Sequence, residues 1–294
     1  MNFDFFRPSA AAAAVLAVAC TGCFDREVPR RQVTAHGMEE AAANRGAVTF
    51  IDLHASGPGD GPLEFPEGLG AFPALSSLSV RGRSLVSGVP ESVAEAKGLE
   101  MLDLAGTGVK DLPQSLTSMP SLRRLYLSDN SLDALPPAVS GIFSLEYLNL
   151  DRNGLSELPD SVGSLSSLKW MRLNRNRLSD LPASAGDGWR SIRKLYLRGN
   201  GLKEVPAAVL RMASLEELDL GENDISEIPP ELCRLPKLRR IDLDSNPRLS
   251  ALPANVGEMK ALTHLFLFRC AVPPEEQARI RAALPDPVRQ FIAF

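Results

Sequence analysis

A nine-residue phrase, L-x-x-L-x-L-x-x-N, recurs along most of this 294-residue chain and constrains its fold more than any other feature. One complete copy runs from Leu145 to Asn153, and a degenerate first copy begins at Val48. The clear copies start 23 or 24 residues apart, at Leu75, Leu99, Leu122, Leu145, Leu168, Ile192, Leu215, Leu238 and Leu262. A fixed period of this length indicates units that stack on their neighbours and bury one continuous core.

Each copy has the pattern of a strand followed by a turn. Side chains alternate between the two faces of a strand, so the apolar fourth and sixth positions point into the core. Positions three, five and seven then face outward. The Asn at position nine recurs as Asn130, Asn153, Asn176, Asn200, Asn223 and Asn246. Its short amide suits backbone groups that a turn leaves unpaired, so we predict a buried structural ladder, with Cys270 in the last slot.

Most copies continue after the Asn as x-L-x-x-L-P-x-x-Φ, where Φ is apolar, for example with Leu158, Pro159 and Val162. Proline ends strand pairing and begins an extended or short helical return path. From about Val48 to Phe294 the chain resembles the leucine-rich repeat family in its 23-residue form with Leu-Pro on the return path. The resemblance implies an α/β solenoid: a leucine-rich repeat horseshoe with a parallel concave sheet and a C-terminal capping helix.

The first residues indicate export. An apolar run of about a dozen residues, 8–19, is too short to span a bilayer and has the length of a secretory signal core. Its end at Cys20 resembles the lipobox of bacterial lipoproteins, which implies acylation of Cys20; the alternatives are an ordinary cleaved signal and a disordered Ala-rich start. We therefore expect a signal peptide at 1–19 and a flexible tether at 20–46, with a short helix around Met38 to Ala43.

The repeat domain is expected to span residues 47–294 and to have a cap at each end. The N-terminal cap, 47–74, contains the Gly/Pro-rich loop GPGDGP. The C-terminal cap, 271–294, begins with prolines and acidic residues and continues with apolar residues at helical spacing until Pro285. This pattern predicts a capping helix, followed by a strand that covers the open edge of the last coil.

Composition and motifs argue against several classes of function. The chain has 32 basic and 36 acidic residues, a net charge of −4, which provides no electrostatic basis for binding nucleic acid. The four Cys do not form a disulfide framework, because two lie near the start and Cys233 and Cys270 lie in different repeats. No His falls in a zinc-binding pattern, and no nucleophile elbow or phosphate-binding loop is present. We predict no catalytic residue, no metal, no cofactor and no enzymatic activity.

The outward strand positions indicate a binding surface. All three Tyr and one of the two Trp lie on them in four consecutive copies, interleaved with Arg and Lys. These residue types dominate binding hot spots, although aromatic residues also favour half-exposed strands for structural reasons. We predict a ligand-binding site, centred on Trp170, formed by Arg124, Tyr126, Tyr147, Asn149, Trp170, Arg172, Lys194, Tyr196 and Arg198. An acidic patch follows it, at Glu217, Asp219, Asp242 and Asp244.

These features predict a non-catalytic module that binds a protein or peptide on the concave face. It is expected to be exported and lipid-anchored in a bacterial cell envelope, at the surface or in the periplasm, and to contact the membrane only through the lipid. The alternative is an intracellular signalling scaffold in the cytoplasm, since the repeats resemble those of the Ras-associated leucine-rich repeat type. Carbohydrate is a third class of ligand, because aromatic side chains also stack on sugars. The sequence does not specify the oligomeric state.

Overall fold

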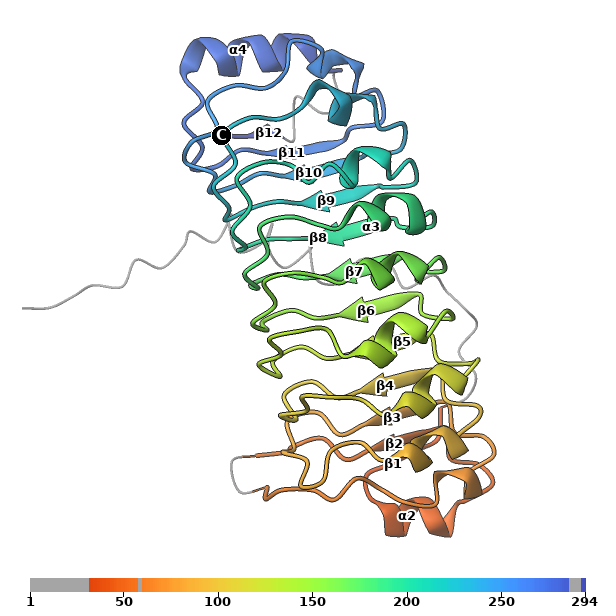
Figure 1. Cartoon of the computed structure of the whole chain (residues 1–294). Helices are drawn as coiled ribbons and strands as arrows, with labels where there is room; N and C mark the ends of the chain where they lie inside the picture. Colours follow the sequence, from red (N-terminus) through yellow and green to blue (C-terminus); the bar gives the residue numbers. More distant parts are fainter. Residues whose placement is uncertain (1–31, 58–59, 286–291) are drawn as a thin grey trace, which may run out of the picture. The chain divides into compact units, whose positions relative to one another are not determined.

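The computed structural model describes residues 32–57, 60–285 and 292–294, and its compact repeat unit runs from Val33 to Phe294. The predicted signal peptide and Cys20 lie outside the described residues. The unit contains one parallel sheet of twelve strands, which follow one another in sequence order from β1 to β12 (Figure 1). Strands in this order belong to coils that contact their immediate neighbours, so the solenoid predicted from the period is confirmed.

Each clear copy of the phrase contributes one strand of three residues. These strands are β3 (Ser77–Ser79), β4 (Met101–Asp103), β5 (Arg124–Tyr126), β6 (Tyr147–Asn149), β7 (Trp170–Arg172), β8 (Lys194–Tyr196), β9 (Glu217–Asp219), β10 (Arg240–Asp242) and β11 (His264–Phe266). The register is residue for residue, as in Tyr147 opposite Trp170 and Leu148 opposite Met171. From β5 to β11 the central residue is buried and its two neighbours are half-buried. Equivalent positions therefore form straight columns across the sheet.

The return paths are mostly single turns of 3-10 helix that begin just after the Leu-Pro step. They are η1 (Leu69–Ala71), η2 (Glu91–Glu95), η3 (Gln114–Ser118), η4 (Pro137–Gly141), η5 (Asp160–Ser164), η6 (Val209–Arg211), η7 (Pro230–Arg234) and η8 (Val256–Glu258). Three coils carry an extra residue, and one of them forms a six-residue α-helix instead, α3 (Ala183–Gly188). Trp189 follows it, fully buried, and its indole N–H donates to the Val162 carbonyl of the preceding coil at 2.8 Å. The insertion thus changes the return path and leaves the strand register intact.

The asparagine ladder is confirmed. The Asn176 side-chain amide donates to the Leu173 carbonyl of its own coil at 3.0 Å and to the Leu150 carbonyl of the preceding coil at 2.9 Å. Its oxygen accepts the Leu155 N–H at 3.2 Å. Each of the other five Asn likewise donates to one carbonyl of its own coil and one of the preceding coil, and accepts a backbone N–H of the preceding coil. Cys270 occupies the last slot as predicted, and its thiol donates to the equivalent carbonyl of the preceding coil at 3.2 Å. Each coil is thereby bonded to the one before it.

The residue before each ladder position has a left-handed backbone, a feature that the sequence pattern did not reveal. Its φ is positive in all nine clear copies: Gly82, Gly106, Asp129, Arg152, Arg175, Gly199, Glu222, Ser245 and Arg269. Only three of these are Gly, the residue that adopts this conformation at no steric cost. The turn geometry therefore holds even where the side chain disfavours it.

Two short strands and a helix close the N-terminal end of the unit. At the N-terminal end, β1 (Thr34–Ala35) pairs with β2 (Phe50–Asp52), and α2 (Met38–Ala43) lies between them in sequence. The tether predicted for 20–46 is therefore wrong from Val33 onward, because Ala35 and Ala41 are fully buried and close the core. The short helix expected there is present.

At the C-terminal end, the predicted capping helix is confirmed as α4 (Pro274–Ala283). Ile280 on this helix is fully buried, and Leu284, which follows it, is 1% exposed. The last strand, β12 (Ile292–Ala293), pairs with β11 and extends the sheet beyond the last copy of the phrase. Both elements cover apolar side chains that a final coil would otherwise leave in water.

Candidate functional site

Three aromatic rings lie side by side on the face of the sheet that points away from the core, called here the open face. This aromatic row consists of Tyr126, Tyr147 and Trp170. The Tyr126 and Tyr147 ring centroids are 4.9 Å apart at an interplanar angle of 38°. The Tyr147 and Trp170 centroids are 5.7 Å apart at 57°. Tilted pairs at these distances are favourable, so each ring holds the next in place.

Tyr196 lies on the same face, in the column that contains Tyr126 and Arg172. The guanidinium carbon of Arg172 lies over its ring, 5.2 Å from the centroid. The Tyr196 hydroxyl donates to the Glu217 carboxylate at 3.0 Å. Burial raises the pKa of the Tyr147 and Tyr196 hydroxyls well above the usual range, with Glu217 contributing at Tyr196, so both phenols stay neutral hydrogen-bond donors.

Two cations of the predicted site, Arg172 and Lys194, form salt bridges with acidic residues of the same chain. Arg172 pairs with the buried carboxylate of Asp151 at 2.6 Å, one coil earlier. Lys194 lies over the Trp170 ring, 4.5 Å from its centroid, and pairs with Glu217 at 2.9 Å. Salt bridges and cation–π contacts therefore hold these side chains against the sheet and orient the rings beside them.

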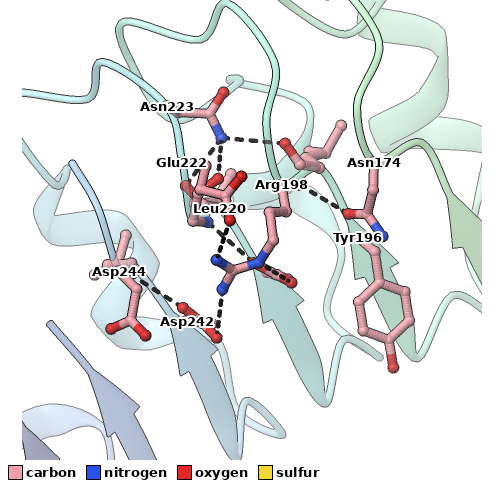
Figure 2. Close-up of polar contacts among 12 residues, drawn as sticks. Asn174, Tyr196, Arg198, Leu220, Glu222, Asn223, Asp242 and Asp244 are labelled. Atoms are coloured by element: carbon pink, nitrogen blue, oxygen red, sulfur yellow. Dashed lines mark hydrogen bonds and ion pairs between the residues drawn. The ribbon is translucent and has the colours of Figure 1, made fainter. Parts of the chain in front are cut away.

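Arg198 belongs to an acidic cluster rather than to the aromatic row. Its guanidinium pairs with Asp219 at 3.1 Å, with Asp242 at 2.7 Å and with Glu222 at 3.2 Å (Figure 2). Asp242 and Asp219 face one another across adjacent strands, and Asp244 follows Asp242 after the strand ends. One cation thus serves three carboxylates. We call Asp219, Asp242 and Asp244 the acidic belt.

Burial and mutual repulsion change the titration of the acidic belt. Burial, reinforced by the charge of Asp242, raises the pKa of Asp244 to about 6. Burial and Asp242 also raise the pKa of Asp219, and Arg198 opposes that rise. The Asp244 carboxylate accepts the Phe268 N–H of the next coil at 2.7 Å. Asp244 therefore takes up a proton as the pH falls through about 6.

The two remaining predicted site residues have different roles. Asn149 accepts the Asp151 N–H at 2.9 Å through its side-chain oxygen, which fixes the start of the turn. Arg124 makes no ion pair with any residue that the structure describes, and its charge lies close enough to lower the pKa of Tyr126 against the rise caused by burial. Arg124 is thus an available cation at one end of the aromatic row.

A second group on the open face was not predicted as a site. Arg240, Phe266, Phe268 and Arg269 lie at its C-terminal end, and we call them the Arg–Phe patch. The Arg240 guanidinium lies over the Phe266 ring at 4.5 Å, and that of Arg269 over Phe268 at 5.3 Å. Both Phe occupy outward positions of the last copy, so the sequence contained this signal. The site was predicted at the Tyr and Trp residues because those residues cluster in consecutive copies.

The described part of the chain offers neither a metal site nor a membrane span. Across residues 32–57, 60–285 and 292–294, no group of three His, Cys, Asp or Glu side chains could hold a metal ion. No helix within these ranges is long and apolar enough to cross a bilayer.

Comparison with known families and structures agrees with this architecture. The family described as leucine rich repeat matches residues 143–202 and 190–248, and that described as leucine rich repeats in two copies matches 97–137. Together they match half of the 294 residues. No curated protein sequence matches the chain.

Two solved plant receptor structures share the fold at low sequence identity. The plant peptide hormone receptor RGFR1 in complex with RGF2 is 21% identical, with a TM-score of 0.58 over 85% of this chain and 45% of the receptor chain. The ectodomain of GASSHO1/SCHENGEN3 from Arabidopsis thaliana, in complex with CASPARIAN STRIP INTEGRITY FACTOR 2, is 23% identical. It has a TM-score of 0.58 over 85% of this chain and 32% of its own. A protein of the same repeat type from Leptospira interrogans is 19% identical, with a TM-score of 0.36 over 90% of this chain and all of its own.

Proposed function

The chain belongs to the leucine-rich repeat family, and we propose that it is a non-catalytic module that binds a protein or peptide on its open face. The fold is typical of protein-binding modules. The observation that carries the proposal is the aromatic row, three half-buried rings in contact on the open face. Such a surface offers the large, rigid area on which binding energy concentrates.

The aromatic row is organised before any partner arrives. Each ring is restrained by its neighbour, and Lys194 is restrained by both Trp170 and Glu217. Binding therefore costs little side-chain entropy. Because the nearby cations are paired, the row itself favours an apolar or neutral segment, with Arg124 available to an acidic group at one end.

An extended peptide fits a face of this kind. Parallel strands lie about 4.8 Å apart, so a segment that crosses β5, β6 and β7 meets the row over roughly 10 Å, or about three extended residues. Two receptors of similar fold were solved as complexes, and one of them is a peptide hormone receptor. We propose a peptide or a protein loop as the ligand of this chain.

The test compares two sets of variants in the full-length chain. Replacing both Tyr147→Ala and Trp170→Ala should reduce recovery of partners crosslinked in the native cell by at least about tenfold. The control is Phe143→Ala, which removes an aromatic ring that is 62% exposed but lies on a return path after η4. Circular dichroism checks that each variant folds. Equal recovery by the double variant and the wild type would reject the site, and binding to a glycan array instead would support a carbohydrate ligand.

We also propose that the chain is exported and held in a bacterial envelope by a lipid on Cys20. The support is the apolar run at 8–19 followed by the lipobox-like residues up to Cys20. Fractionation of the wild type and of Cys20→Ala tests this. Loss of membrane association in the variant is the expected result. A wild type that is recovered in the cytosol with its start intact would favour the intracellular scaffold.

A further inference from the structure

Two arginines of the Arg–Phe patch differ from Arg172 and Arg198, which are held by carboxylates. The side chains of Arg240 and Arg269 make no ion pair and no hydrogen bond with any residue that the structure describes. Each guanidinium lies over a phenylalanine ring instead, at 4.5 Å and 5.3 Å. No carboxylate of the described residues therefore forms a salt bridge with either guanidinium.

A guanidinium that lies over a ring keeps its hydrogen-bonding capacity. The contact with the ring is electrostatic and uses no N–H group of the arginine. The planar fork of N–H donors matches the two oxygens of a carboxylate. Because the rings restrain Arg240 and Arg269, little freedom is lost when an anion binds.

Phe268 adds apolar surface beside these donors. Its side chain is 50% exposed, which is unusual for a large hydrophobic residue in the described part of this chain. His264 stacks on Phe266 with centroids 6.2 Å apart and an interplanar angle of 19°. Burial and the nearby charge of Arg240 lower the pKa of His264, so its ring remains neutral at pH 7. The patch thus combines two cations with an exposed apolar ring.

We infer that Arg240, Phe268 and Arg269 form a second binding surface, for an acidic peptide segment in which an apolar side chain adjoins a carboxylate. The apolar side chain covers Phe268 and the carboxylate bonds to the guanidinium groups. This surface is separate from the aromatic row, because β8 and β9 lie between β7, which contains Trp170, and β10, which contains Arg240. It does not depend on the proposed role of that row.

The surroundings favour a short acidic segment over a nucleic acid. Asp244 adjoins the patch, since its carboxylate accepts the Phe268 N–H at 2.7 Å. Asp242 lies two residues before it on β10. A continuous polyanion would have to pass these carboxylates, whereas one or two carboxylates of a peptide reach the arginines without doing so.

The test uses fluorescence anisotropy of the full-length chain with two fluorescein-labelled hexapeptides. One alternates glutamate and leucine, and the other has glutamine in place of glutamate. The wild type should bind the glutamate peptide at least about tenfold more tightly than the glutamine peptide. The double variant Arg240→Gln, Arg269→Gln should lose this preference, and Phe268→Ala should weaken binding of both peptides.

Two controls separate this surface from others. Arg175→Gln changes an exposed arginine at the same position of its turn as Arg269, but with Asn174 rather than a phenylalanine before it. It should leave binding unchanged, as should Phe143→Ala, which removes an exposed ring on a return path. The inference is overturned by equal binding of the two peptides, by no binding up to about 1 mM, or by an equal loss in either control. The aromatic row is tested by variants of Tyr147 and Trp170 and this surface by variants of Arg240, Phe268 and Arg269, so failure of one proposal is distinguishable from failure of the other.

Discussion

The asparagine ladder and the open face use the same 23-residue spacing in opposite ways. In the ladder, Asn223 donates to two backbone carbonyls, of Leu197 at 3.1 Å and Leu220 at 2.9 Å. On the open face, Arg198 bonds to carboxylates of the following coils (Figure 2). Backbone partners recur in every coil whatever its sequence, so one residue type suits every ladder slot. Side-chain partners differ from coil to coil, which leaves the open face able to acquire a binding surface without loss of the fold.

The largest effect is expected from breaking the ladder with Asn246→Ala. Asn246 is fully buried and donates to the carbonyls of Leu220 and Leu243 at 3.0 and 2.7 Å. It also accepts the Ile225 N–H at 3.0 Å. Each buried group left without a partner costs about 1–3 kcal/mol, so the free energy of unfolding should fall by about 3 kcal/mol or more. Urea unfolding measures this change.

The matched control for the ladder is Asn149→Ala on the open face. This asparagine is half-buried and accepts one hydrogen bond, from the Asp151 N–H. Its loss should cost about 1 kcal/mol. If both substitutions destabilise the protein equally, the distinction between ladder and open face does not hold.

A smaller, pH-dependent effect is expected from Asp244→Asn in the acidic belt. The folded-state pKa of Asp244 is raised to about 6 from an ordinary 3.8. Between these values the unfolded chain loses the proton first, so this group lowers the free energy of unfolding as pH rises from about 4 to about 6. The neutral amide avoids that cost and can still accept the Phe268 N–H.

Urea midpoints of wild type and Asp244→Asn at pH 4 and pH 7 measure the effect. The variant should be more stable by about 1 kcal/mol at pH 7, after allowance for solvent screening of a partly exposed group, and nearly equal to wild type at pH 4. Salt should reduce the difference at pH 7. A variant that is less stable than wild type at pH 7 would mean that the Asp244 charge stabilises the fold.

Most of the fold could be predicted because the period fixes which residues occupy equivalent positions. It identified the buried leucines and the ladder including Cys270. The prolines, acidic residues and helical spacing of the tail predicted the capping helix α4. It did not show that Thr34–Ala35 joins the sheet, because a strand of two residues with small side chains has no periodic signal. The left-handed backbone of the residue before each ladder position was also missed, because Asp, Arg, Glu or Ser occupies this position in six copies and Gly in only three.

The candidate site was less predictable, because the period gives the column of a residue and not the direction of its side chain. Arg198 was expected beside the aromatic row, but its long side chain turns toward acidic residues of later coils. Tyr196 was expected in one cluster with Trp170 and Arg172, and its ring lies against the Arg172 guanidinium while its hydroxyl donates to Glu217. A long flexible side chain can reach several partners, and the packing around it determines which partner it contacts.

The smallest effect is expected at the left-handed residue of the turn. Arg175 has φ 54° and Gly199, one coil later, has φ 67° at the equivalent position. A side chain at this φ is strained, whereas glycine is not. Arg175→Gly should therefore raise the free energy of unfolding by about 0.5 kcal/mol, because relief of strain exceeds the entropy that glycine adds to the unfolded chain.

The reverse change, Gly199→Ala, should destabilise the protein by about 1 kcal/mol. The added Cβ also meets the Arg175 side chain at 3.3 Å, a contact that the flexible side chain can relieve by moving. Urea unfolding of both variants and of their combination separates strain from contact. If strain dominates, the two effects add; if the contact dominates, Gly199→Ala is harmless once Arg175→Gly is present. Because neither residue lies in the aromatic row or the Arg–Phe patch, peptide binding should not change in any of the three, and a loss of binding would show that the turn geometry also orients the open face.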